Sequence, residues 1–340
     1  MFSLFIVGLA LSAAIAWSIG GNDTANSIDA IVGGGVLDIK KAMTLFATSQ
    51  AVGAVVQGYM VMKTIGRGVV PDIDVVEAVA ATLATFTWIT IATLKGVPIS
   101  TTHSVTSAVI GIGIAKWLQD GLMSINIDAV LKIIISWISS PLASIALAIP
   151  LYHFFSWMFS RWSIDNTIAK VILIFVTAFS AYSFGANDVG NATSVYVTIT
   201  SRYLGIPDAE TMRFLAIFAS FFIALGGFTV GKKVVETLAF KITRLDIPMA
   251  MASEASNALV VWIFTTLPYM LFGYGLPIST TYATAGSIIG VGIAKNRGLR
   301  GVNVKTIIFI MGAWILTLPL VASASIAIYF LIKTFVGVTM

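Results

Sequence analysis

Long apolar stretches, separated by short polar segments, run along the whole chain. Ten can be marked, each at least 18 residues long, at 2–33, 42–62, 78–95, 97–116, 130–158, 168–199, 213–231, 249–272, 277–294 and 304–332. A helix needs about 20 residues to cross the hydrocarbon core of a bilayer. The pattern therefore predicts an all-α polytopic membrane protein. Several stretches approach 30 residues, which indicates broken helices or hairpins and about 10–12 membrane segments.

Composition strengthens this prediction and narrows the chemistry. Of the 340 residues, 58% are hydrophobic and 10% are charged, whereas soluble domains carry about a quarter charged residues. The chain has no cysteine, so disulfides and Cys-ligated metals are excluded. The net charge of +5 is better explained by loops between membrane segments than by nucleic acid, which we do not expect as a partner. The first stretch lacks a preceding Lys or Arg, so we expect a retained helix and not a cleaved signal.

The second half of the sequence repeats the first. PISTTHSVTSAVIGIGIAK, at 98–116, aligns without gaps on PISTTYATAGSIIGVGIAK, at 277–295, with 11 of 19 positions identical. The polar clusters around Asp23 and Asp188 correspond as well. Matched features in the same order indicate an internal duplication. We predict that residues 1–160 form one transmembrane repeat and residues 161–340 the other.

Glu77 and Glu254 form a further matched pair. Each is followed by Ala and lies a little over 20 residues before its PISTT segment. Both are expected at helix starts, where a carboxylate interacts favourably with the helix dipole and needs no other function.

The repeats are predicted to be inverted, because five stretches per half bring the second half into the membrane from the opposite side. The positive-inside tendency supports this, with twelve basic side chains assigned to the cytoplasm and six outside. The cytoplasmic set is Lys40, Lys41, Arg161, Lys170, Lys232, Lys233, Lys241, Arg244, Lys295, Arg297, Arg300 and Lys305, and the outer set is Lys63, Arg67, Lys116, Lys132, Arg202 and Arg213. Both termini then face outward from the cell membrane. Inverted repeats are typical of secondary transporters, whose site lies at the repeat interface near mid-membrane.

The two polar clusters are the main candidate for a cation site. A carboxylate inside a bilayer is costly, so it points to function. Each cluster places one carboxylate and two amides at helical spacing, and all-oxygen ligation suits a hard cation such as Na⁺. The candidate ligands are Asn22, Asp23, Asn26, Asn187, Asp188 and Asn191. Gly20, Gly21, Gly185 and Gly190 would permit close helix approach or local unwinding. Alternatively, the amides and acids only hydrogen-bond between helices.

The PISTT segments are the candidate anion site. Pro suits the first position of a helix, so the following hydroxyls are expected at a helix N-terminus, which attracts anions. Two such N-termini could hold a tetrahedral oxyanion through Ser100, Thr101, Thr102, Ser279, Thr280 and Thr281, with Gln50 as a weaker candidate. Lys95 is the one basic residue close to either segment in sequence. Bound cations would therefore have to balance the anion. Alternatively, the hydroxyls cap and pack, and His103 is expected to be a packing residue.

Together, GNDTANS at 21–27 and GANDVGNA at 185–192, each followed in its half by PISTT, resemble the PiT family of inorganic phosphate transporters. That family's signature is close to GANDVANA, once per half. The resemblance covers nearly the whole chain. It implies a symporter of phosphate and Na⁺, not an enzyme, usually described with 12 membrane segments, extracellular termini and a homodimeric assembly. It assigns Asp23, Asn26, Asp188 and Asn191 to the cation and the Ser-Thr runs to phosphate, with Na⁺ as coupling ion and no other cofactor.

Three other functions stay open at this point. One is an H⁺-coupled phosphate permease or a sulfate permease. Another is an intramembrane prenyltransferase, because NDTANSID with Asp29 loosely matches an Asp-rich motif for Mg²⁺-diphosphate. Against the enzyme, Asn26 replaces the second acid and the second copy has no trailing Asp. A structural or receptor role would leave the matched acids unexplained.

Overall fold

The computed structural model describes residues 2–65, 70, 73–121, 125–205, 207–273 and 275–336, and these residues include helices but no strand. The helices of the first half are α1 (Phe2–Asp23), α2 (Ala25–Gly33), α3 (Ile39–Gln57), α4 (Tyr59–Ile65), α5 (Val75–Leu94), α6 (Thr101–Asp120) and α7 (Ile127–Trp162). Those of the second half are α8 (Asn166–Leu204), α9 (Ala209–Val230), α10 (Lys232–Lys241), α11 (Ile247–Phe272), α12 (Thr280–Asn296), the 3₁₀ turn η1 (Leu299–Gly301) and α13 (Val304–Val336).

Each of the ten apolar stretches falls on helix, so the all-α membrane prediction is confirmed. The first two stretches are broken helices, formed by α1 with α2 and by α3 with α4. Within the described residues, seven spans are long and apolar enough to cross a membrane, including Phe5–Gly33, Val130–Trp162 and Val304–Phe335. The short helix α10 was not predicted, because its charged residues interrupt the apolar pattern that marks the other helices.

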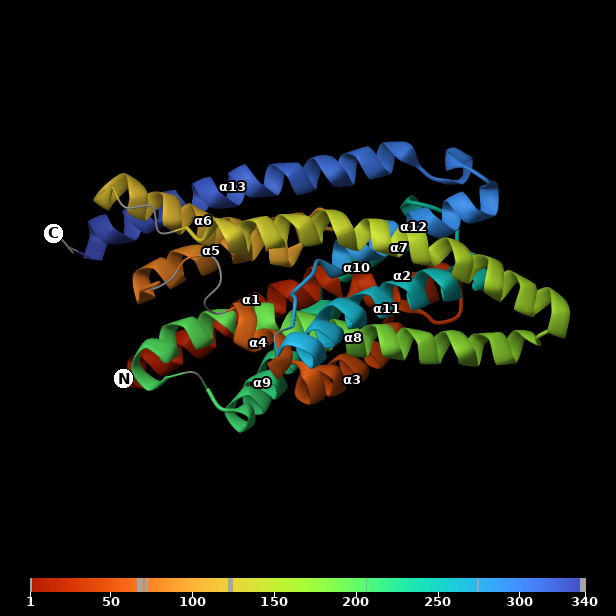
Figure 1. Cartoon of the computed structure of the whole chain (residues 1–340), viewed down its shortest axis with the longest axis horizontal. Coiled ribbons are helices and arrows are strands. Elements are labelled where there is room, and N and C mark those ends of the chain that lie inside the picture. Colours follow the sequence, from red (N-terminus) through yellow and green to blue (C-terminus); the bar gives the residue numbers. More distant parts are fainter. Residues whose placement is uncertain are drawn as a thin grey trace.

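The elements of the two halves make corresponding contacts. Figure 1 shows the hairpin α5–α6 opening toward the end of the molecule that carries both chain termini, and the hairpin α11–α12 opening toward the other end. The long last helix of each half packs on the hairpin of the other half, α7 on α12 and α13 on α6. Likewise α1 packs on α9 and α8 on α3. These contacts support two inverted repeats, although the division into 1–160 and 161–340 stays a prediction.

Close backbone contacts hold the centre of the fold together. A Cβ on Gly20 would lie 1.8 Å from the Ile223 carbonyl oxygen, and one on Gly185 would lie 1.9 Å from the Gln50 carbonyl oxygen. The reciprocal glycines of these helix pairs are Gly53 and Gly226, each with a neighbouring carbonyl oxygen at 1.9 Å from the added Cβ. Small residues of this kind let membrane helices approach backbone to backbone. The predicted role of glycine in close approach is therefore confirmed, and the contacts make Ile223 the second-half counterpart of Gln50.

The predicted unwinding occurs in only one of the two polar motifs. In the first motif α1 ends at Asp23 and α2 begins at Ala25, and the Thr24 hydroxyl donates to the Gly20 carbonyl oxygen at 2.6 Å. The second motif lies inside the uninterrupted helix α8. Its Gly190 therefore does not unwind the helix. The expectation of unwound backbone is wrong for the second half.

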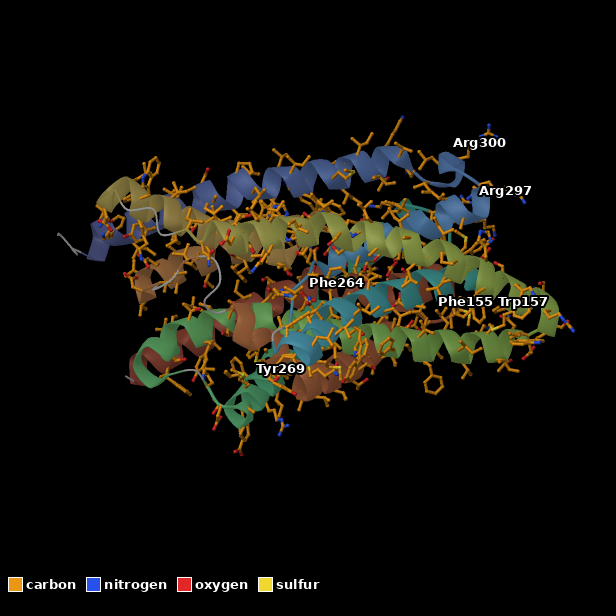
Figure 2. All side chains as sticks on the ribbon, viewed as in Figure 1. Phe155, Trp157, Phe264, Tyr269, Arg297 and Arg300 are labelled. Carbon is orange, nitrogen blue, oxygen red and sulfur yellow. The ribbon has the colours of Figure 1, made fainter. Side chains whose placement is uncertain are left out.

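The basic residues Arg297 and Arg300 mark one end of the molecule. Figure 2 shows Arg297 and Arg300 at the end opposite the chain termini. Lys232 and Lys233 begin the short helix α10 and do not lie in a loop, and their predicted cytoplasmic side stays a prediction. The Lys233 ammonium donates to the Leu94 carbonyl oxygen at 2.9 Å, beside the α5–α6 turn. Arg67 lies outside the described residues, as do the side chains of Lys63 and Arg202.

We expect Gly20→Ala to destabilise the protein, because the added methyl group would meet the backbone of α9 and force α1 away from it. Overpacking a tight contact costs about 1–3 kcal/mol. The matched control is Gly312→Ala in α13, where nothing lies within 4 Å of the added Cβ. Thermal unfolding in detergent should show a lower midpoint for Gly20→Ala alone. Equal midpoints for both variants would contradict the close packing.

Candidate functional site

Serine hydroxyls start the two hairpin helices at the PISTT segments. The Ser100 hydroxyl accepts from the His103 amide at 3.1 Å, and the Ser279 hydroxyl accepts from the Tyr282 amide at 3.2 Å. The prediction that Pro98 opens the helix is wrong, because α6 begins at Thr101. Serine satisfies a free amide of the first turn, which proline cannot do. The predicted helix N-termini are nevertheless present, and the Ser-Thr runs surround them.

Asn22 and Asn187 hold the turns that precede these helices. The Ile99 amide donates to Asn22 Oδ1 at 3.0 Å, and the Ile278 amide donates to Asn187 Oδ1 at 3.1 Å. The side-chain amides donate in turn to backbone carbonyls, that of Val97 at 3.1 Å and that of Ile278 at 3.0 Å. The two asparagines therefore fix the turns in position. Their predicted part in binding Na⁺ stays a prediction.

The two aspartates lie beside the turns and are fully buried. Asp23 Oδ2 accepts from the Thr101 hydroxyl at 2.7 Å, and Asp23 Oδ1 has no hydrogen-bond partner. The Asp188 oxygens accept from Asn191 Nδ2 and from Asn187 Nδ2, both at 3.1 Å. Each carboxylate thus keeps acceptor capacity that the surrounding donors do not fill.

Residues of the two halves meet at one point. Asn26 Nδ2 donates across to the Thr281 hydroxyl oxygen at 3.0 Å, and Asn191 Nδ2 donates to that of Thr102 at 2.9 Å. The Thr281 hydroxyl itself donates to the Ile99 carbonyl oxygen at 2.9 Å, between the two hairpin turns. Asn26 Oδ1 and Asn191 Oδ1 are buried without a partner. The structure therefore brings the predicted cation ligands and the predicted anion ligands into contact.

This site contains negative charge without a matching basic side chain. The ion pairs among the described residues join Lys41 to Asp38, Lys116 to Glu77, Lys232 to Glu236 and Lys295 to Asp246. None of them involves Asp23 or Asp188. A buried carboxylate that lacks a partner is strongly unfavourable. The site therefore offers unmatched acceptor oxygens and negative charge to a cation.

Gln50 is not brought to the anion site. Its amide Nε2 donates to the Ser220 carbonyl oxygen at 3.0 Å, and its own carbonyl lies against Gly185 of α8. These contacts join α3 to α8 and α9. The geometry gives no support to the predicted contact between Gln50 and phosphate.

His103 and Tyr282 connect the two hairpins. The His103 Nδ1 atom lies 2.5 Å from the Tyr282 hydroxyl oxygen. Each ring packs on a tryptophan, Trp137 for His103 and Trp314 for Tyr282, with ring centroids 3.9 Å apart in both pairs. These contacts agree with the expected packing role of His103. The two tryptophans were not predicted, since single aromatic residues in long apolar helices carry no distinctive pattern.

The matched glutamates have different surroundings. Glu77 lies in the first turn of α5, shares a capping box with Asp74 and pairs with Lys116 at 3.3 Å, as expected of a helix start. Glu254 is the eighth residue of α11 and is 1% exposed, so the expectation of a helix start is wrong for it. The spacing to PISTT gave a wrong prediction because α11 begins at Ile247, well before Glu254, whereas α5 begins at Val75, just before Glu77.

Comparison with known proteins shows the family of this chain. Residues 19–325 match the phosphate transporter family. A Rhizobium meliloti protein, described as a probable low-affinity inorganic phosphate transporter, is 31% identical over 323 residues, covering 91% of this chain and 90% of that protein. A Pyrococcus furiosus protein provisionally named a phosphate permease is 27% identical over 395 residues, 93% of each chain. The solved structure of a sodium-dependent phosphate transporter superposes with a TM-score of 0.81 and 27% identity, covering 98% of this chain and 99% of that one.

The match extends over both polar motifs and both PISTT segments. It agrees with the predicted resemblance and overturns the prenyltransferase alternative, since the matched proteins are transporters and not enzymes. The chain is a multi-pass membrane protein that belongs to the phosphate transporter family.

Proposed function

We propose that this protein is a symporter that moves inorganic phosphate with Na⁺ by alternating access. One observation carries the proposal: two buried aspartates without basic partners lie at the meeting point of two helix N-termini. The acids require cations, and the helix N-termini attract an anion. A solved structure that is similar to this chain is described as a sodium-dependent phosphate transporter.

Na⁺ would bind the oxygens that the surrounding residues leave free. These include Asp23 Oδ1, Asn26 Oδ1 and Asn191 Oδ1, each buried and without a hydrogen-bond partner. Asp188 supplies the corresponding charge in the second half. Carboxylate and amide oxygens are ligands for hard cations.

Phosphate would bind the first turns of α6 and α12. The hydroxyls of Thr102 and Thr281 now donate to carbonyl oxygens of the opposite turn, at 3.3 Å and 2.9 Å. A phosphate oxygen could replace those acceptors when the two turns separate. Because no basic side chain in this site can balance the anion, the affinity for phosphate depends on bound Na⁺. By linkage, the affinity for Na⁺ then depends equally on bound phosphate.

Movement of one half against the other would expose this site to each side in turn, as in other inverted-repeat transporters. The basic end, marked by Arg297 and Arg300, would face the cytoplasm, because positive loops are retained there. Both termini lie at the opposite end in Figure 1 and would then be extracellular, on the cell membrane. The homodimer stays a prediction.

The proposed function predicts phosphate accumulation driven by a Na⁺ gradient. Purified protein in proteoliposomes should take up ³²P-phosphate when Na⁺ is higher outside, and an inward H⁺ gradient alone should not drive uptake. Labelled sulfate serves as the substrate control. Uptake under the H⁺ gradient alone would favour proton coupling, and uptake of sulfate in place of phosphate would contradict the substrate.

Asp23→Asn and Asp188→Asn should each reduce Na⁺-driven phosphate uptake to background, because each variant removes one of the charges that attract the coupling ions. Asp38→Asn is the matched control, since this acid is exposed and pairs with Lys41. Initial rates in proteoliposomes, normalised to the amount of inserted protein, measure the effect. Normal rates with unchanged Na⁺ dependence in both site variants would contradict the assignment.

Thr102→Val and Thr281→Val should weaken phosphate binding more than Na⁺ binding. Each variant removes one hydroxyl from a helix N-terminus, which costs about 1 kcal/mol or roughly fivefold in half-saturating phosphate. Thr48→Val is the control, because this exposed hydroxyl donates only within its own helix α3. Uptake measured over a range of phosphate at saturating Na⁺ should separate the variants from the control. Equal half-saturating concentrations would place phosphate elsewhere.

A further inference from the structure

A second pair of buried acids lies outside the site described above. Asp29 in α2 and Glu254 in α11 are each 1% exposed. Both carboxylate oxygens of Asp29 and Oε1 of Glu254 are without a hydrogen-bond partner. The two acids lie on helices that pack against each other, α2 and α11. Neither takes part in an ion pair among the described residues.

Neutral oxygen ligands converge on the same acids. The Ser180 hydroxyl oxygen of α8 accepts from Asn257 Nδ2 at 3.3 Å. Asn257 follows Glu254 by three residues on the same helix, so the two side chains share a face. Asn257 Oδ1 is also buried without a partner, with its residue 3% exposed. The helices α2, α8 and α11 contact one another, which encloses the group.

The chemistry of these groups indicates which kind of ligand they would bind. Two buried carboxylates without a nearby positive charge are strongly unfavourable unless a cation binds between them or a proton neutralises one of them. The free ligand atoms are all oxygens, from two carboxylates and one amide, with a hydroxyl beside them. Oxygen ligands of this kind favour hard cations over those that prefer nitrogen or sulfur.

We propose that Asp29, Glu254 and Asn257 form an additional cation site that takes Na⁺. It lies one helical turn along α2 from Asn26, about 4.5 Å along the helix axis. The two sites are physically joined, because Asn257 Nδ2 donates to the Asn26 carbonyl oxygen at 2.7 Å. A role of this site in transport rests on the proposed function. Binding of Na⁺ at the site does not depend on that function.

The site is absent from the second repeat. Asn191 corresponds to Asn26, and three residues beyond it stands Ser194, where the first half has Asp29. The Ser194 hydroxyl donates to the Asn191 carbonyl oxygen at 3.0 Å and so stays within its own helix. The additional acid is therefore no copy of the duplicated motif. The site combines Asp29 of the first half with Glu254 and Asn257 of the second half, and it lies on one side of the central site.

Equilibrium binding of ²²Na⁺ to the purified full chain, without phosphate, tests the proposal directly. Asp29→Asn and Glu254→Gln, singly and together, should each bind about one sodium ion fewer per protomer than the parent protein. Asp38→Asn and Ser194→Ala are the controls and should bind the parental number. The removal of repulsion should also raise the unfolding temperature of the site variants in choline buffer. Added Na⁺ should then stabilise them less than the parent.

An unchanged Na⁺ count together with an unchanged Na⁺-induced rise in unfolding temperature would overturn the proposal. An unchanged count with altered proton release on folding or binding would show a proton shared by the two acids, which also overturns the Na⁺ site. A failure of the proposed function is distinguishable from both. In that case the parent would bind one sodium ion more than the Asp29→Asn variant but would not take up phosphate under a Na⁺ gradient.

Discussion

The hydrogen bonds from Asn22 and Asn187 to the turns before α6 and α12 determine the geometry of the centre of this protein. In the membrane interior no water is available to hydrogen-bond the free backbone groups of a turn. Each asparagine side chain supplies that partner by accepting from a backbone amide of the turn. Without these bonds the two helices could not begin near mid-membrane with their amides directed at a common point. The polar motif and the PISTT segment of each half are thus parts of one structural unit.

Much of this unit could be predicted from the sequence, because duplicated polar residues in apolar stretches are rare and costly. Asp23, Asn26, Asp188 and Asn191 were predicted as a group, and the structure brings them together with the hydroxyls of both halves. The exact start of each helix could not be predicted, since proline and serine are both favourable near a helix N-terminus. The position of Gln50 also required the fold. Its distance from the PISTT turns depends on how α3 packs on α8 and not on any local pattern.

The departures from symmetry were harder to predict than the symmetry itself. A repeat in sequence predicts equal environments, yet Glu77 forms an ion pair at a helix start whereas Glu254 is buried beside Asp29. Likewise one polar motif is broken at Thr24 and the other is continuous. These differences depend on where each helix begins and how it packs, and only the packed structure shows them.

The exchange of long helices between halves has a consequence for the origin of the fold. Because α7 covers α12 and α13 covers α6, each half leaves its own hairpin to be packed by the other. A single half alone would expose the polar turn of that hairpin to lipid. An ancestral half-length protein with this arrangement would therefore have been stable only as a pair inserted in opposite orientations. In a single chain, each half supplies the helix that covers the hairpin of the other half.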